Sequence, residues 1–168
     1  MMKMECGKYE SPMGPLWLTG EKGILTGLSF ERPHGEVTPG EFPAVKRWLD
    51  AYFRGIPQEI DFPMAPSGTP FQKRIWDLLL EIPFGQTRTY GDLAREMAQI
   101  LGKEKMSAQA VGQAVGRNPI AIIIPCHRII GAKGKLTGYA FGNEKKQWLL
   151  NHEESGRERY ALRRLQTD

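Results

Sequence analysis

Residues 118–130 read NPIAIIIPCHRII, and the rest of the chain is best interpreted from this stretch outward. The apolar run at 120–124 is too short for a typical helix, so we predict a buried β-strand there. Pro125 interrupts that strand. Cys126 and His127 follow at once, which puts a thiol and an imidazole side by side at the end of a buried element.

Upstream of this stretch, three segments carry the signals of helices. Thr69–Gln72 is a capping box with proline at the first helical position, and apolar residues then repeat at helical spacing until Pro83. A second helix is predicted from after Thr89 to Gly102, and a third, rich in small residues, from near Ser107. Two short helices joined by a turn indicate a helix-turn-helix, although an ordinary helical hairpin fits the same pattern.

Downstream, the chain returns to turns and then to a last helix. Gly131–Lys135 has the composition of a hairpin tip and is a candidate wing. Asn143 is the expected cap of a final helix that contains Trp148 and ends near Gly156. Residues 157–168 are rich in charge and are predicted to form a tail.

The first sixty residues predict a separate small domain. Pro15–Thr19 and Ile24–Phe30 are apolar runs separated by a glycine-rich turn, the pattern of a β-hairpin. Pro43–Arg54 has helical apolar spacing. The proline-rich stretch Ile56–Gly68 is typical of an extended linker. We therefore expect an N-terminal domain at 1–62, a linker at 63–68, a second domain at 69–156 and the tail at 157–168.

The composition limits the classes of protein to which the chain can belong. The 168 residues are 40% hydrophobic and 25% charged with a net charge of +4, which fits a globular protein and permits an anionic partner. No apolar run approaches the roughly 20 residues of a membrane span, and no secretory signal is visible. Cys6 and Cys126 alone make neither a disulfide framework nor a tetrahedral zinc site. We expect a cytoplasmic protein with no membrane association and no metal.

Cys126 and His127 are the residues with the clearest chemical potential. A free thiol is only about 3% thiolate at neutral pH, and an imidazole that takes its proton raises that share. A third group must orient the imidazole, and Glu153 is a candidate. From the spacing alone, a small core cysteine beside a surface histidine and glutamate remains the alternative.

The letters around this cysteine add a family resemblance. IPCHRI at 124–129 resembles the active-site motif of the O6-alkylguanine-DNA alkyltransferases, the methylated-DNA–protein-cysteine methyltransferases. The similarity is dense and in order over 71–153 and looser in the first sixty residues. It includes PFG at 83–85, TY at 89–90, AVG at 110–112, NP at 118–119, GY at 138–139 and WLLNHE at 148–153.

The resemblance implies a fold and a reaction. The fold is α+β, with a small ribonuclease-H-like α/β domain followed by a winged helix-turn-helix-like domain. The reaction is direct reversal of damage in DNA: the alkyl group of O6-alkylguanine, and of O4-alkylthymine, passes irreversibly to Cys126. The thioether is stable, so each molecule acts once, as a monomer and without a cofactor.

The resemblance also implies roles for individual residues. His127 activates Cys126 through a water, and Glu153 orients His127. Asn118 fixes the bend before the cysteine, and Tyr90 donates its hydroxyl to the departing guanine. The residues implied around the substrate base are Val115, Arg128, Tyr139 and Ala140, with Arg128 also expected to support the local structure.

Double-stranded DNA is the implied partner, bound through its minor groove with the damaged base rotated out of the helix. The residues implied to contact DNA are Ser107, Gln109, Ala110, Gly112 and Arg117. Gln109 stands where the family typically has an arginine that fills the vacated base position. The preceding segment is longer than usual, so Lys105 and Met106 are alternative occupants of that slot. Ala140 and Phe141 replace the small hydroxyl residue that often follows the pocket tyrosine.

Two other classes of function remain open at this stage. One is a DNA protein that binds or senses lesions without transferring the alkyl group, although family members of that kind replace the cysteine that this chain keeps. The other is a Cys-His hydrolase, which requires an oxyanion site and turns over repeatedly.

Overall fold

The computed structural model describes residues 3–167, with side chains described as far as residue 162. The chain divides into two compact units. One contains the residues up to Ser67 together with those from His152 onward, and the other contains Gly68–Asn151.

The first unit is built on a four-stranded sheet with the order β3-β2-β1-β4. β1 (Met4–Ser11), β2 (Gly14–Glu21) and β3 (Ile24–Ser29) form an antiparallel meander, and β4 (Val37–Pro39) runs parallel to β1. The predicted hairpin is confirmed as β2 and β3. β1 was not predicted, because its sequence MECGKYES mixes charged and small residues and has no apolar run.

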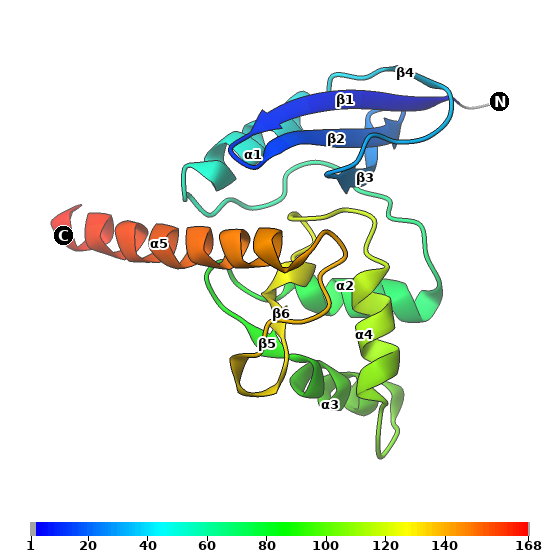
Figure 1. The fold of residues 1–168 in the computed structure, drawn as a ribbon, viewed down its shortest axis with the longest axis vertical. Coiled ribbons are helices and arrows are strands. Elements are labelled where there is room, and N and C mark those ends of the chain that lie inside the picture. The colour runs from blue at the N-terminus through cyan, green and yellow to red at the C-terminus, as the bar shows by residue number, and fades with distance from the viewer. Residues whose placement is uncertain (1–2, 168) are drawn as a thin grey trace. The chain divides into compact units, whose positions relative to one another are not determined.

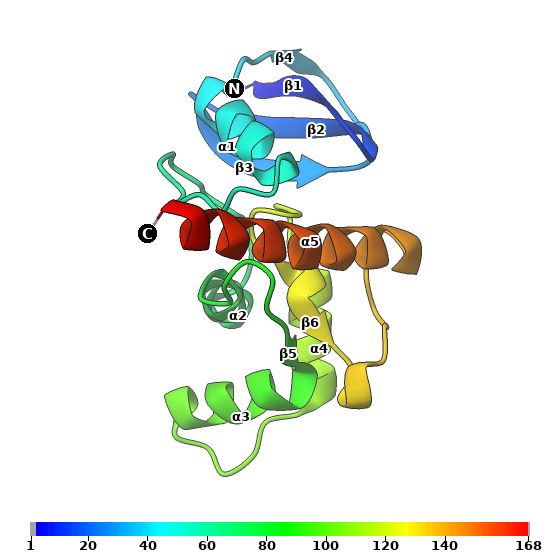
Figure 2. The ribbon, with the colours of Figure 1, turned by 90° about the vertical axis from the view of Figure 1, so that its left-hand side faces the viewer.

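Helix α1 (Pro43–Phe53) lies over one face of this sheet (Figures 1 and 2). The helix is confirmed where its apolar spacing predicted it. Phe42, just before the helix, has a φ of 47° and is buried. A Cβ built on Gly20 would lie 2.8 Å from the Phe42 ring, so the absence of a side chain there lets the ring lie directly on the sheet backbone. The buried residues of these elements are Leu16, Leu18, Leu25, Leu28, Val45, Trp48, Leu49 and Tyr52.

The last helix, α5 (Asn143–Thr167), is longer than the sequence predicted. It begins at Asn143 but continues well past Gly156, so the charged residues 157–167 are helical and do not form a separate tail. Gly156 is buried inside the helix and close to the end of α1: a Cβ on Gly55 would lie 3.1 Å from its Cα. A glycine thus marks a close helix contact here, where the prediction took it for a helix end.

The second unit contains the predicted helices at the predicted places. α2 (Pro70–Leu80) and α3 (Tyr90–Leu101) both begin with complete capping boxes, at Thr69 and Thr89. α4 (Ala108–Gly116) is capped by Ser107. α3 and α4 are joined by the loop at 102–107 and form the helix-turn-helix (Figure 2). β5 (Arg88–Thr89) pairs in parallel with β6 (Ile129–Ile130), which follows the short 3-10 helix η1 (Cys126–Arg128).

Two expectations in this unit are wrong. The run at 120–124 is buried as predicted but forms a turn and not a strand, with Ile122 in the left-handed region at a φ of 70°. Gly131–Lys135 is not the tip of a β-hairpin: it contains the 3-10 turn η2 (Ala132–Gly134), and the backbone N–H of Gly131 closes it on the Lys135 carbonyl at 2.7 Å. In the run at 120–124, apolar composition predicts burial correctly but not the backbone conformation.

Trp76 fixes the position of helix α4 within this unit. Its indole is buried, and Nε1–H donates to the Ala114 carbonyl near the end of α4 at 2.9 Å. The same carbonyl also accepts the Arg117 N–H at 3.2 Å, so the indole supplies a second bond in the last turn of α4. One side chain of α2 therefore sets both the packing and the register of α4.

We expect Trp76→Phe to lower the free energy of unfolding by about 2 kcal/mol, because it removes a buried hydrogen bond and leaves a void beside α4. Denaturant unfolding of the two proteins measures the difference. An unchanged midpoint would mean that α2 and α4 are held together without this bond.

Candidate active site around Cys126

Cys126 begins the short helix η1 and is 9% exposed. Its backbone N–H donates to the Ile124 carbonyl at 2.8 Å, and the Arg128 N–H donates to the Pro125 carbonyl at 3.0 Å. The cysteine is thus the first residue after a tightly hydrogen-bonded turn. These bonds fix the backbone that carries the largely buried thiol.

The Asn118 side chain closes the loop that leads to the cysteine. Its Nδ2 donates to the Ile124 carbonyl at 2.7 Å, and its Oδ1 accepts the Ile120 N–H at 3.0 Å. One amide therefore joins the two ends of the turn in which Ile122 adopts its left-handed conformation.

The surroundings of Cys126 have opposing effects on its thiol. Burial raises the pKa of the thiol above its ordinary value. A hydrogen bond from Asn118, the positive charge of Lys146 and the backbone N–H groups of Cys126 and His127 act in the opposite direction, and burial prevails. The cysteine is therefore a neutral thiol at neutral pH, but donors and a positive charge already surround the place where a thiolate would form.

Lys146 is the site residue that sequence reasoning missed. It comes from α5, is fully buried, and its Nζ donates to the Thr137 carbonyl at 2.8 Å. Burial lowers the pKa of this ammonium, and the charge on Cys126 acts against that shift. Lys146 stands three residues before Leu149 and lies on the same buried face of α5, which the charged sequence of that helix does not reveal.

Tyr90, the first residue of α3, contacts the loop that follows η2. Its hydroxyl donates to the Thr137 carbonyl at 3.2 Å, the same oxygen that accepts from Lys146. A Cβ on Gly138 would lie 2.8 Å from this hydroxyl, and one on Gly112 would lie 3.7 Å from the ring. Burial and the charge on Cys126 both raise the pKa of the phenol, so Tyr90 remains a proton donor near the thiol.

The other residues implied around the chemistry fall into different settings. His127 is fully buried, and Glu153 is 1% exposed in the first unit. Arg128 is buried and donates to the Ile82 carbonyl at 2.6 Å, with its guanidinium 5.9 Å from the Phe84 ring centre. These contacts give Arg128 a structural function in the second unit.

The residues implied to line the base pocket differ in exposure. Tyr139 is buried and meets Phe141 edge to face at 5.7 Å. Val115 is buried on α4, whereas Ala140 is exposed. Phe141 therefore packs on the tyrosine itself, which is a use of the bulky residue that the sequence comparison did not anticipate.

Helix α4 presents the residues implied to contact DNA along one element. Ser107, Gln109 and Arg117 are exposed, and Ala110 and Gly112 are half-buried. Ser107 accepts the Ala110 N–H at 3.2 Å, so it also serves as the helix cap. Gln109 is thus an exposed side chain in the first turn of α4.

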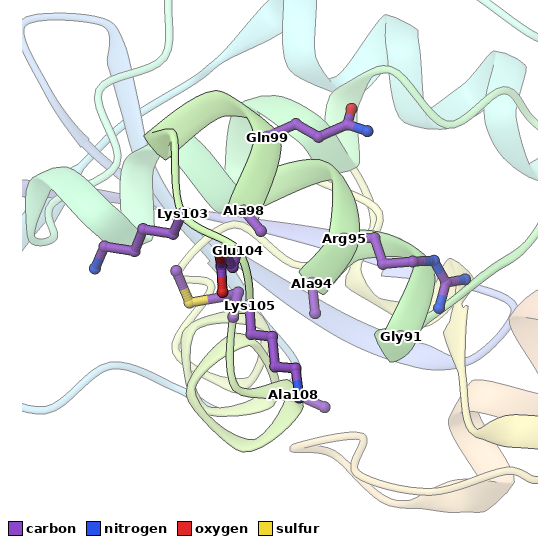
Figure 3. A pocket seen from close by; sticks show the side chains of 10 residues that line it. Gly91, Ala94, Arg95, Ala98, Gln99, Lys103, Glu104, Lys105 and Ala108 are labelled. Carbon is purple, nitrogen blue, oxygen red and sulfur yellow. The ribbon is translucent and has the colours of Figure 1, made fainter.

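A hollow of about 400 Å³ lies beside α3, where the loop at 102–107 runs back toward α4 (Figure 3). Arg95, Lys103, Lys105 and Met106 are among its lining residues, and Gln109 is not. Lys105 and Met106, the alternative occupants of the arginine slot, thus line this hollow, while Gln109 stands on the exposed surface of α4.

Within the described part of the chain, no helix is long and apolar enough to cross a membrane. Among the same residues, no group of three or more histidine, cysteine, aspartate or glutamate side chains is arranged to hold a metal ion.

Comparisons with known proteins agree with this architecture over nearly the whole chain. Residues 4–66 match the ribonuclease-like domain of 6-O-methylguanine DNA methyltransferase, and residues 70–155 match the DNA-binding domain of the same protein class. These two matches define the class: a cysteine-bearing methyltransferase with one domain of each kind.

Individual relatives are similarly close. A methylated-DNA–protein-cysteine methyltransferase of Methanosarcina acetivorans is 48% identical over 155 residues, covering 88% of this chain and 96% of the relative. The crystal structure of Mycobacterium tuberculosis O6-methylguanine methyltransferase is 44% identical, covers 90% of this chain and 93% of its own, and has a TM-score of 0.78. A structure of M. tuberculosis OGT in complex with DNA is 45% identical, with coverages of 92% and 94% and the same TM-score.

The chain therefore belongs to the methylated-DNA–protein-cysteine methyltransferase family. The predicted family and the predicted α+β fold, with its winged helix-turn-helix-like second domain, are confirmed.

The charge of Lys146 is open to a direct test. The thiolate is the form of Cys126 that reacts with iodoacetamide, so the reaction rises with pH. We expect Lys146→Met to displace this curve to higher pH and to slow the reaction about tenfold at a given pH, because a positive charge that favours the thiolate is lost. Peptide mapping counts Cys126 separately from Cys6.

Lys145→Met is the matched control, since it removes a lysine from the adjacent position of α5 and should leave the curve in place. Coinciding curves for Lys146→Met and the unaltered protein would exclude a charge effect of Lys146 on the thiol.

Proposed function

We propose that this chain repairs DNA by taking the alkyl group from O6-alkylguanine, and from O4-alkylthymine, onto Cys126. The observation that carries the proposal is the setting of Cys126: a buried thiol after a loop closed by Asn118, within the positive field of Lys146. Together with family membership, this setting supports a cysteine that accepts an alkyl group once and is not regenerated.

The proposed step is a displacement at the alkyl carbon. The sulfur forms a bond to that carbon while the carbon–O6 bond breaks, and the bonding pair leaves with O6 into the guanine ring. The thiol proton passes through a water to His127, and the departing base gains a proton, so the overall exchange is balanced. Because burial keeps Cys126 neutral in the resting protein, the thiolate forms only when this proton path is used.

Three further groups have proposed roles in that step. Tyr90, whose phenol remains protonated, donates to the guanine as negative charge develops on it. Lys146 stabilises the thiolate through its charge. The pairing of Glu153 with His127 stays a prediction from the family resemblance.

Access to the alkyl group requires the nucleotide to leave the base stack, and this unstacking costs roughly a few kcal/mol of free energy. We propose that α4 enters the minor groove, with Ser107, Ala110, Gly112 and Arg117 along the contact, and that Gln109 enters the vacated position. Contacts to phosphate oxygens carry no sequence information, which suits a protein that must act on a lesion in any context. We further propose that the protein works as a monomer in the cytoplasm.

The proposal separates from its two rivals by stoichiometry. A lesion-binding protein without transfer activity gains no mass on Cys126. A Cys-His hydrolase releases product repeatedly, whereas the proposed reaction stops after one equivalent. Intact mass and peptide mapping after incubation with an O6-methylguanine duplex distinguish all three.

We expect Cys126→Ala to abolish methyl transfer and to keep DNA affinity within a few-fold of the unaltered chain, because phosphate contacts supply most of the binding free energy. Mass spectrometry of the protein and a gel-shift titration measure the two effects. Methyl uptake by the variant at another residue, such as Cys6, would contradict the assignment of Cys126 as acceptor.

Gln109→Arg tests the residue proposed to fill the base gap. An arginine adds stacking and cation–π contacts of about 1 kcal/mol to the flipped state, so repair of duplex DNA should accelerate about fivefold. Reaction with free O6-benzylguanine should not change, since the free base needs no flipping. Single-turnover rates on both substrates give the comparison.

The matched control is Gln113→Arg, which adds the same charge at another exposed position of α4. Equal acceleration by both variants would indicate a general effect of charge on DNA binding. Lys105 or Met106 would then be the residue that fills the position vacated by the flipped base.

A further inference from the structure

Tyr52, in the N-terminal unit, is a buried tyrosine with a polar bond that the family comparison does not explain. It is 2% exposed, and its hydroxyl donates to the Glu153 carboxylate (Oε2) at 2.6 Å. Glu153 is itself buried, and the two residues are 101 positions apart in the chain. A short bond from a hydroxyl to a carboxylate is of the strong, charge-assisted kind.

The surroundings of Tyr52 hold its ring in one orientation. Trp48 stacks on it with ring centres 5.4 Å apart and an interplanar angle of 11°, and Phe53 meets it edge to face at 5.2 Å. The Trp48 indole is fixed in turn, since its Nε1–H donates to the Gln58 carbonyl at 3.2 Å. The orientation of the Tyr52 hydroxyl is therefore fixed by these contacts in the protein without substrate.

The backbone beside the pair is fixed as well. His152, the neighbour of Glu153 on α5, donates from Nε2 to the Tyr52 carbonyl at 2.7 Å. The close approach of Gly55 and Gly156 brings the end of α1 against α5 within the same unit. Side-chain and backbone bonds thus connect one helical turn of α1 to the turn of α5 that carries Glu153.

We propose that Tyr52 is a positioning residue for alkyl transfer: its hydroxyl holds the buried Glu153 carboxylate in the orientation needed by His127. The inference rests on the proposed role of Glu153. A carboxylate has about four lone-pair sites, so accepting from Tyr52 leaves capacity to accept from an imidazole.

The test uses Tyr52→Phe, which keeps the ring and its aromatic contacts and removes only the hydroxyl. We expect transfer from free O6-benzylguanine to slow about tenfold, as when the group that orients an essential histidine is lost. Transfer from an O6-methylguanine duplex should slow by the same factor, with unchanged DNA affinity. Tyr9→Phe is the matched control, because it removes a hydroxyl that donates to Asp50 Oδ1 at the same 2.6 Å in the same unit.

A double-mutant cycle with Glu153→Gln separates positioning from a structural effect. If Tyr52 acts through Glu153, Tyr52→Phe slows the unaltered protein but adds nothing in the Glu153→Gln background. Full multiplication of the two effects, or a wild-type rate for Tyr52→Phe, overturns the inference. The same holds if Tyr9→Phe is slowed as much as Tyr52→Phe.

The cycle also shows which proposal has failed. A wild-type rate for Glu153→Gln removes the role of Glu153, and the inference about Tyr52 falls with it, while Cys126 remains the acceptor as long as it gains the methyl group. Thermal unfolding of each variant identifies loss of fold. Two results together count against positioning: a strongly lowered unfolding midpoint for Tyr52→Phe, and a further slowing of transfer when Tyr52→Phe is added to Glu153→Gln.

Discussion

The Asn118 amide is the interaction on which the site in the second unit depends. It binds the backbone at both ends of a five-residue turn, and that turn delivers Cys126 to the start of η1. The turn includes a β-branched residue with a positive φ, a conformation that costs free energy and persists only where the surroundings enforce it. The same amide also hydrogen-bonds the thiol and lowers its pKa, so one side chain serves both backbone geometry and nucleophile.

Burial shifts the pKa values of both Cys126 and Lys146. It raises the pKa of the Cys126 thiol and lowers the pKa of the Lys146 ammonium, so burial disfavours the charged form of both groups. Their mutual attraction acts against both shifts. The thiol is therefore neutral at rest, and the charge of Lys146 acts to favour the thiolate.

Much of the fold was predictable because its signals are local. The capping box at Thr69 and the cap at Ser107 mark helix starts through contacts within one turn, and both helices begin there. The turn at 120–124 was predicted as a strand because its conformation is set by Asn118 and by tertiary packing, and apolar composition carries no information about either. Cys126 and His127 could be found from the sequence because they stand in a local motif. Lys146 could not, because its role depends on the buried face of α5, and Tyr52 could not, because its partner is 101 positions away.

The Thr137 carbonyl connects two parts of the proposed mechanism. It accepts from both Tyr90 and Lys146, so the loop that carries Tyr139 is bound to α3 and to α5 through one oxygen. If the Tyr90 hydroxyl turns toward a guanine, the half-buried carbonyl keeps its bond to Lys146 and is not left unsatisfied. The lysine bond is the shorter of the two, at 2.8 Å against 3.2 Å, which fits a partner that stays while the other leaves. Tyr90 can then change partners at small cost, because the loop does not depend on it alone.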